Sequence, residues 1–217
     1  FRGKKTTNKL LRGVTHSRFD HVGLVIRGPV GPYLFDATGD GICLHTFKKF
    51  HRKGWYKPYQ YVCRRALVWK KKFKDPETGK FVEQTVDMPE KYVNLLHKFV
   101  ERTVGMNYRL TPRSLMKKNV KTLAKNTTKK GYFCSELVAA AYQAIGILPK
   151  DKPQAQQYWP GTFQYTLKSW AKFDHRMQQC VTTGAVPHLD RSEPRILWSG
   201  VDTVPALNSA KRGGCFG

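Results

Sequence analysis

The sequence predicts an α+β domain, because strand-like segments come first along the chain and amphipathic helical segments follow. Residues 21–47 hold short β-branched and aromatic runs that are separated by Gly/Pro turns. From Pro89 onward the apolar residues recur with helical spacing instead. The length of 217 residues, 40% of them hydrophobic, suits one domain with flanking segments.

The predicted sheet begins with three strands: HVGLVIR at 21–27, YLFDAT at 33–38 and ICLHTF at 42–47. The turn sequences GPVGP and TGDG lie between them, which favours antiparallel hairpins. A basic, aromatic connection follows at 48–59, and QYVCRRALVW at 60–69 has the composition of a further strand. Residues 70–81 are expected to form a hairpin tip or a surface loop.

Two helices are predicted in the second half of the chain. The first starts at Pro89, has Tyr92, Leu96, Phe99 and Val100 on one face, and ends at Gly105. The second starts at Cys134 and stops near Gly146. We therefore expect a domain over 19–175 with a basic insert at 113–130, preceded by a basic arm at 1–18 and followed by an irregular tail at 176–217.

The charge of the chain is strongly one-sided. It has 39 Lys and Arg against 15 Asp and Glu, a net charge of +24. Such a surplus attracts polyanions, so we expect an acidic partner such as ribosomal RNA, an acidic protein surface (tubulin, for example) or an anionic membrane surface, with the protein as a possible subunit of a large assembly. The insert carries no acid, and its candidate polyanion-binding residues are Lys117, Lys118, Lys121, Lys125, Lys129 and Lys130. No apolar run reaches the roughly 18–20 residues of a membrane span.

The five cysteines form no CxxC pair, which argues against a disulfide framework and against a zinc knuckle. No cofactor or metal is expected. A reducing compartment is the simpler assumption, whether cytoplasm, cytoskeleton or mitochondrial matrix. The chain starts at Phe1 rather than Met, so targeting information is expected to be missing from it.

Cys134 is the candidate nucleophile. It stands in GYFCSELVAAAY, where the helical pattern begins, and a helix N-terminus favours a thiolate through its free N–H groups and dipole. The alternative is a small buried core residue. His21 opens the most apolar strand and shares a face with Gly23, which leaves room beside the imidazole. Asp36 lies in the next strand, near enough across a hairpin to orient that imidazole, although it also suits a cap of the following turn.

These segments resemble the permuted papain-like hydrolases of the YiiX/YaeF type, circularly permuted relatives of the NlpC peptidases and of lecithin:retinol acyltransferase. The resemblance rests on HVGLVI, YLFDAT, ICLHTFKKF with YVCRRAL, VGMNYRL and FCSELVAAAY, which occur in the family's order over about residues 20–165. It implies a circularly permuted papain-like (NlpC-like) fold, an antiparallel sheet packed on a cysteine-bearing helix. It also implies Cys134 as nucleophile, His21 as base and Asp36 as the orienting acid.

Asp36 departs from the Glu that the family usually has at the third position, and the side chain is one methylene shorter. Two functions therefore stay open. The first is a cysteine-dependent hydrolase or acyltransferase, amidase-like or peptidase-like, acting on an amide or ester bond. The second is a basic structural or binding subunit that keeps the fold without catalysis and grips an acidic polymer. The intact Cys–His–Asp set favours the enzyme.

Overall fold

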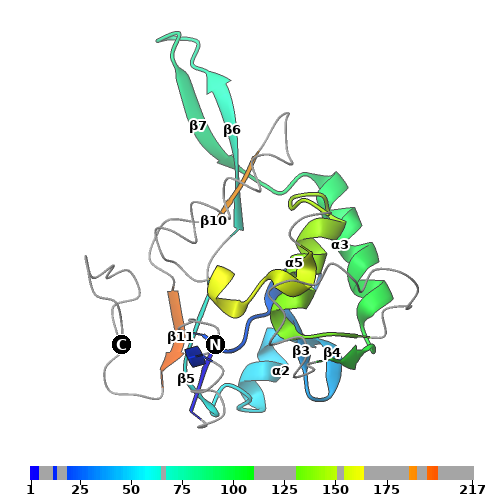
Figure 1. Cartoon of the computed structure of the whole chain (residues 1–217). Helices are drawn as coiled ribbons and strands as arrows, with labels where there is room; N and C mark the ends of the chain where they lie inside the picture. Colours follow the sequence, from blue (N-terminus) through cyan, green and yellow to red (C-terminus); the bar gives the residue numbers. More distant parts are fainter. Residues whose placement is uncertain are drawn as a thin grey trace. The chain divides into compact units, whose positions relative to one another are not determined.

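The protein is α+β, with small antiparallel sheets and three described helices (Figure 1). The computed structural model describes residues 1–4, 12–13, 19–64, 67–109, 131–150, 154–163, 186–189 and 195–199. The chain divides into two compact units, one of residues 1–20, 56–87 and 161–217, and the other of residues 21–55 and 88–160. None of the described helices is long and apolar enough to cross a membrane.

The first unit contains two three-stranded antiparallel sheets. In one sheet the strand order is β1 (Arg2–Gly3), β5 (Tyr59–Arg64) and β11 (Arg195–Ser199). In the other it is β10 (Val186–Leu189), β6 (Leu67–Lys74) and β7 (Phe81–Val86). The strand predicted over 60–69 is thus two strands, and the hairpin predicted at 70–81 joins β6 to β7. Segments 1–18 and 176–217, predicted to be irregular, both contribute strands. These strands pair with β5 and β6, which are far away in sequence, so a local sequence pattern does not predict them.

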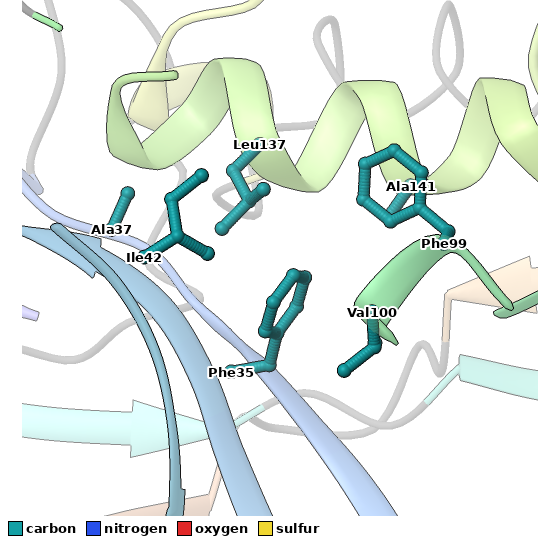
Figure 2. Packing of buried hydrophobic residues seen from close by; sticks show 7 residues of the cluster. All are labelled: Phe35, Ala37, Ile42, Phe99, Val100, Leu137 and Ala141. Atoms are coloured by element: carbon teal, nitrogen blue, oxygen red, sulfur yellow. The ribbon is translucent and has the colours of Figure 1, made fainter. Parts of the chain in front are cut away.

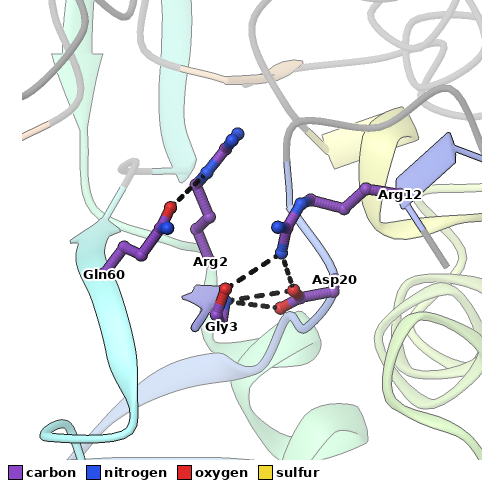
Figure 3. A network of polar contacts seen from close by, with 5 residues as sticks. All are labelled: Arg2, Gly3, Arg12, Asp20 and Gln60. Carbon is purple, nitrogen blue, oxygen red and sulfur yellow. Dashed lines mark hydrogen bonds and ion pairs between the residues drawn. The ribbon is translucent and has the colours of Figure 1, made fainter. Parts of the chain in front are cut away.

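A buried ion pair fixes the beginning of this unit (Figure 3). Asp20 forms a short ion pair with the guanidinium of Arg12, and both of its carboxylate oxygens accept from the N–H of Gly3 at 3.0 Å. Arg12 also donates to the carbonyl of Gly3 at 3.1 Å, and Arg2 donates to the side chain of Gln60 at 2.6 Å. The charge of Asp20 is thus paired with Arg12, and the N–H and carbonyl of Gly3 both have partners. A buried charge requires such pairing and hydrogen bonding.

The second unit starts with the predicted sheet. Strands β2 (Leu24–Gly28), β3 (Gly31–Thr38) and β4 (Gly41–Thr46) follow one another as antiparallel neighbours. A helix, α2 (Phe47–Arg52), comes next, within the stretch described from the sequence only as a basic, aromatic connection. Its six residues are too few to show a helical period, which is why the pattern missed it.

The two predicted helices are α3 (Glu90–Thr103) and α5 (Cys134–Ala144), each within a few residues of its expected bounds. Between them the chain adds β8 (Asn107–Tyr108), which pairs in parallel with β9 (Gly131–Tyr132). A Cβ on Gly131 would lie 2.1 Å from the carbonyl oxygen of Asn107, so this close pairing requires a glycine. Short 3-10 helices, η1 (Ala155–Gln157) and η2 (Pro160–Phe163), follow α5.

The core of this unit joins the sheet to both long helices (Figure 2). Phe35 and Leu137 are fully buried, and Phe35 meets Phe99 edge-on with ring centroids 6.3 Å apart. Each such side chain contributes about 1.5–3 kcal/mol when it is fully buried. The remaining members come from β3, β4, α3 and α5: Ala37, Ile42, Val100 and Ala141. This cluster fixes the cysteine-bearing helix against the sheet that carries Asp36.

Candidate active site

Cys134 is the first residue of α5 and is 5% exposed. Phe133 ends the extended backbone before it, and the N–H of Phe133 donates to the carboxylate of Glu136 at 3.3 Å. This carboxylate accepts from the main chain just before the helix, and the N–H of Leu137 in the first turn donates to the carbonyl of Phe133 at 2.9 Å. The CSEL sequence thus starts the helix at the thiol.

His21 and Asp36 meet because of the hairpin between β2 and β3. The two-residue turn pairs Gly28 with Gly31 and Leu24 with Phe35. Continuing this register brings Asp36 opposite residue 23, and Nε2 of His21 lies 3.1 Å from Oδ2 of Asp36. Both side chains are largely shielded, with 13% and 9% of their surface exposed.

Gly23 is the residue that allows this contact. A Cβ at position 23 would lie 2.9 Å from Cβ of Asp36 and 3.1 Å from the carbonyl oxygen of Phe35. The sequence predicted that Gly23 leaves room for the imidazole. In the structure, the missing side chain at Gly23 leaves room for Asp36 instead. The shorter Asp reaches the imidazole because the missing side chain lets the strands approach closely.

The pKa values of His21 and Cys134 are shifted in opposite directions. Burial lowers the pKa of His21, but hydrogen bonds to Asp36 and Cys134 and the charges of both outweigh it and raise the pKa to about 9. Burial raises the pKa of the Cys134 thiol, yet the hydrogen bond and charge of His21 bring it below its ordinary value of 9.0. Each group of the pair therefore favours the charged form of the other, a thiolate beside an imidazolium.

Three groups at the thiol were missed by the sequence analysis as site residues. The backbone N–H groups of Val22 and Ser135 bond to Cys134 and help to lower its pKa. Tyr108 is the third group. Burial raises the pKa of its phenol, and the charge of Cys134 raises it further. The VGMNYRL motif contained Tyr108 without revealing its role, and main-chain donors leave no signal in a sequence.

The remaining predicted residues are the lysines of the basic insert. Lys117, Lys118, Lys121, Lys125, Lys129 and Lys130 are outside the described residues. Within the described part of the chain, no three His, Cys, Asp or Glu side chains gather in a way that suits a metal ion. Cys43 and Cys134 are not in disulfides.

Chemically, the arrangement couples a buried thiol, a titratable imidazole and a carboxylate in one hydrogen-bonded series. Such a series can generate a nucleophile and then supply a proton. Comparison with protein-family models, with curated proteins and with solved structures finds no match to this chain. Function must therefore be inferred from the residues themselves.

Proposed function

We propose that the protein is a cysteine-dependent hydrolase or acyltransferase that acts on an amide or ester bond. The observation that carries this proposal is the series from the Cys134 thiol through His21 to Asp36, with a lowered thiol pKa and a raised imidazole pKa. Cys134 is the nucleophile, His21 moves the proton, and Asp36 orients the imidazole. A purely structural cysteine in an apolar core would have its pKa raised by burial.

The proposed reaction has two stages. In the first, the Cys134 thiolate attacks the carbonyl carbon and forms a C–S bond, while the carbonyl oxygen takes the negative charge. His21 then gives a proton to the departing amine or alcohol as the C–N or C–O bond breaks, which leaves a thioester. In the second, His21 takes a proton from water or another acceptor, whose oxygen or nitrogen displaces the thiolate.

The developing oxyanion needs hydrogen-bond donors. The N–H of Ser135, which bonds to Cys134, and the hydroxyl of Tyr108, whose pKa is raised by burial and by the charge of Cys134, are the candidates. A phenol with a raised pKa stays protonated and remains a donor.

We further propose a circularly permuted papain-like fold for the unit that holds the site. The packing of α5 on the β2–β3–β4 sheet supports it, with Asp36 in β3, His21 three residues before β2 and Cys134 at the start of α5. The replacement of the usual Glu by Asp is compatible with this fold, because Gly23 lets the shorter side chain approach.

A second candidate is a basic binding or structural subunit that keeps this fold and grips an acidic polymer. The net charge of +24 favours it, and it is compatible with a thiol that reacts but turns over no substrate. Reactivity and turnover must therefore be measured separately.

Labelling by iodoacetamide at pH 7 tests the thiol, and the protein contains its own control. Burial and the charges of Asp36 and Asp40 raise the pKa of Cys43, and Lys49 only partly offsets them. We expect Cys134 to be alkylated faster than Cys43, although Cys43 is the more exposed of the two. Peptide mass spectrometry gives both rates, and a slower Cys134 would contradict the proposal.

Turnover of activated acyl esters and amides then separates enzyme from subunit. We expect a thioester on Cys134 in the wild type, no thioester in Cys134→Ala, and about 10²–10⁴-fold slower turnover in His21→Gln. A hydroxylamine acceptor distinguishes acyl transfer from hydrolysis. Rapid alkylation without any thioester would favour the subunit.

A further inference from the structure

The second unit also carries a basic, aromatic surface that shares no residue with the Cys134 site. Residues 41–55 of this unit include four Lys and Arg and no Asp or Glu, although the whole chain has 15 acids. Within this stretch, α2 and the residue after it present five exposed basic side chains: Lys48, Lys49, His51, Arg52 and Lys53. We call these five residues and Trp55 the α2 surface.

The α2 surface is firmly built in spite of its short helix. Thr46 caps the N-terminus, since its hydroxyl accepts from the N–H of Lys49 at 3.1 Å. Phe50 is 6% exposed and anchors the inner face of the helix. Because Phe50 packs the inner face of α2 against the protein, the backbone positions of the basic residues on the outer face are fixed.

The position of Trp55 is set by the end of the helix. Gly54 has φ of +65°, and its N–H donates to the carbonyl of His51 at 2.9 Å. The N–H of Trp55 donates to the carbonyl of Phe50 at 3.3 Å. These two bonds make a Schellman motif, which requires a left-handed residue where Gly54 stands. The indole is thus held by the backbone directly after the basic turn.

The indole is also supported by side chains and remains open. Trp55 is 38% exposed, His45 meets it edge-on with centroids 4.8 Å apart, and Nζ of Lys49 lies 5.8 Å from the ring centroid. An aromatic side chain of this kind, surrounded by cations, suits a base that stacks while neighbouring phosphates are neutralised.

We propose that the α2 surface binds single-stranded nucleic acid, with Lys48, Lys49, Arg52 and Lys53 on phosphates and Trp55 stacked against a base. Single-stranded nucleic acid engages both features at once, with phosphates for the cations and a base for the indole. Acidic proteins and anionic lipid are the alternative partners that the stacking test includes. No residue of the α2 surface belongs to the Cys134 site, so this proposal stands or falls independently of acyl chemistry.

A salt titration of the full chain with fluorescent oligouridylate tests the charges. The variant Lys48→Gln/Lys49→Gln/Arg52→Gln should bind more weakly, with the log–log salt slope flatter by about 0.7 for each phosphate contact removed. The matched control, Lys91→Gln/Lys98→Gln/Arg102→Gln, removes two lysines and one arginine from exposed positions of α3. It should keep the wild-type slope. Equal losses in the two variants would overturn the proposal, because net charge alone would then explain binding.

Trp55→Leu tests the stacking. It should weaken binding of oligouridylate about 5- to 100-fold, the loss expected for one stacked base, and leave the salt slope unchanged. Binding to an RNA duplex, whose bases are already stacked, should not depend on Trp55. An unchanged affinity for oligouridylate would overturn the proposal. So would an equal dependence on Trp55 with polyglutamate or phosphatidylserine vesicles. Circular dichroism reports in each variant that the protein is folded.

Discussion

Asp20 and Asp36 are both buried carboxylates, at 7% and 6% exposure, yet they have different partners. Asp20 binds the guanidinium of Arg12 and the N–H of Gly3. Asp36 binds the imidazole of His21. The guanidinium keeps its charge at every accessible pH, whereas an imidazole can gain or lose a proton near neutrality.

The difference shows how one type of side chain serves two purposes. A carboxylate held by a permanent cation and by one backbone N–H stays bound at every accessible pH, because neither partner loses its proton. A carboxylate held by an imidazole raises the pKa of that imidazole, and the imidazolium in turn lowers the pKa of a nearby thiol. Structural and chemical roles are thus separated by the partner rather than by burial.

The largest effect should come from removing the ion pair between Asp20 and Arg12. Asp20→Ala leaves the Arg12 guanidinium buried without its counter-charge, and we expect it to lower the free energy of unfolding by about 3–5 kcal/mol. Asp36→Ala should cost less, about 1–3 kcal/mol, because His21 can become neutral once the carboxylate is gone. Urea titrations followed by circular dichroism measure both values. Equal losses would mean that the partner makes no difference.

Asp36→Asn should move the alkaline limb of the pH–rate profile. In the wild type, turnover should rise as Cys134 ionises, below the ordinary thiol pKa of 9.0, and fall as the imidazolium of His21 loses its proton near pH 9. Without the Asp36 charge the pKa of His21 falls, so the alkaline limb shifts to lower pH. The loss of turnover at pH 7 should be smaller than in His21→Gln, because the imidazole itself remains.

Asp20→Asn is the matched control for this profile, since it also converts a buried carboxylate to an amide. It should destabilise the fold and leave both limbs in place. A shift of the alkaline limb in Asp20→Asn, or its absence in Asp36→Asn, would contradict the division of roles.

Much of this site could be predicted from local sequence patterns. The apolar stripe after Cys134 and the glycine that follows the helix placed Cys134 at the start of α5, and the turn between two β-branched runs placed Asp36 in β3. The prediction that His21 opens the first strand was wrong, because β2 begins three residues later, at Leu24. Such features work because helix starts, helix stops and hairpin turns depend on neighbouring residues. The family resemblance added roles for the three residues, and these roles stay proposals.

What the sequence could not provide depends on contacts between distant segments. No sequence pattern predicts the ion pair between Arg12 and Asp20. Strands β10 and β11 lie at the edges of their sheets and come from a segment with little apolar periodicity. The donors of Val22 and Ser135 are main-chain atoms, which every residue has. For α2 the local signals were present, Thr46 before it and Gly54 after it, but six mostly basic residues gave no apolar period between them.

The smallest effect concerns the glycine that lets Asp36 approach. In Gly23→Ala the new Cβ would lie within 2.9 Å of Cβ of Asp36, which is backbone-attached and cannot swing away. We expect the strands to separate slightly, at a cost of about 1–2 kcal/mol for overpacking, and the His21–Asp36 contact to loosen. Because a weaker contact lowers the pKa of His21, the alkaline limb should move in the same direction as in Asp36→Asn, by less. Gly39→Ala is the control, since a Cβ there meets nothing within 4 Å and should change neither stability nor profile. If Gly23→Ala lost stability while the alkaline limb stayed at about 9, close packing at Gly23 would serve the sheet alone, and the orientation of His21 would need another explanation.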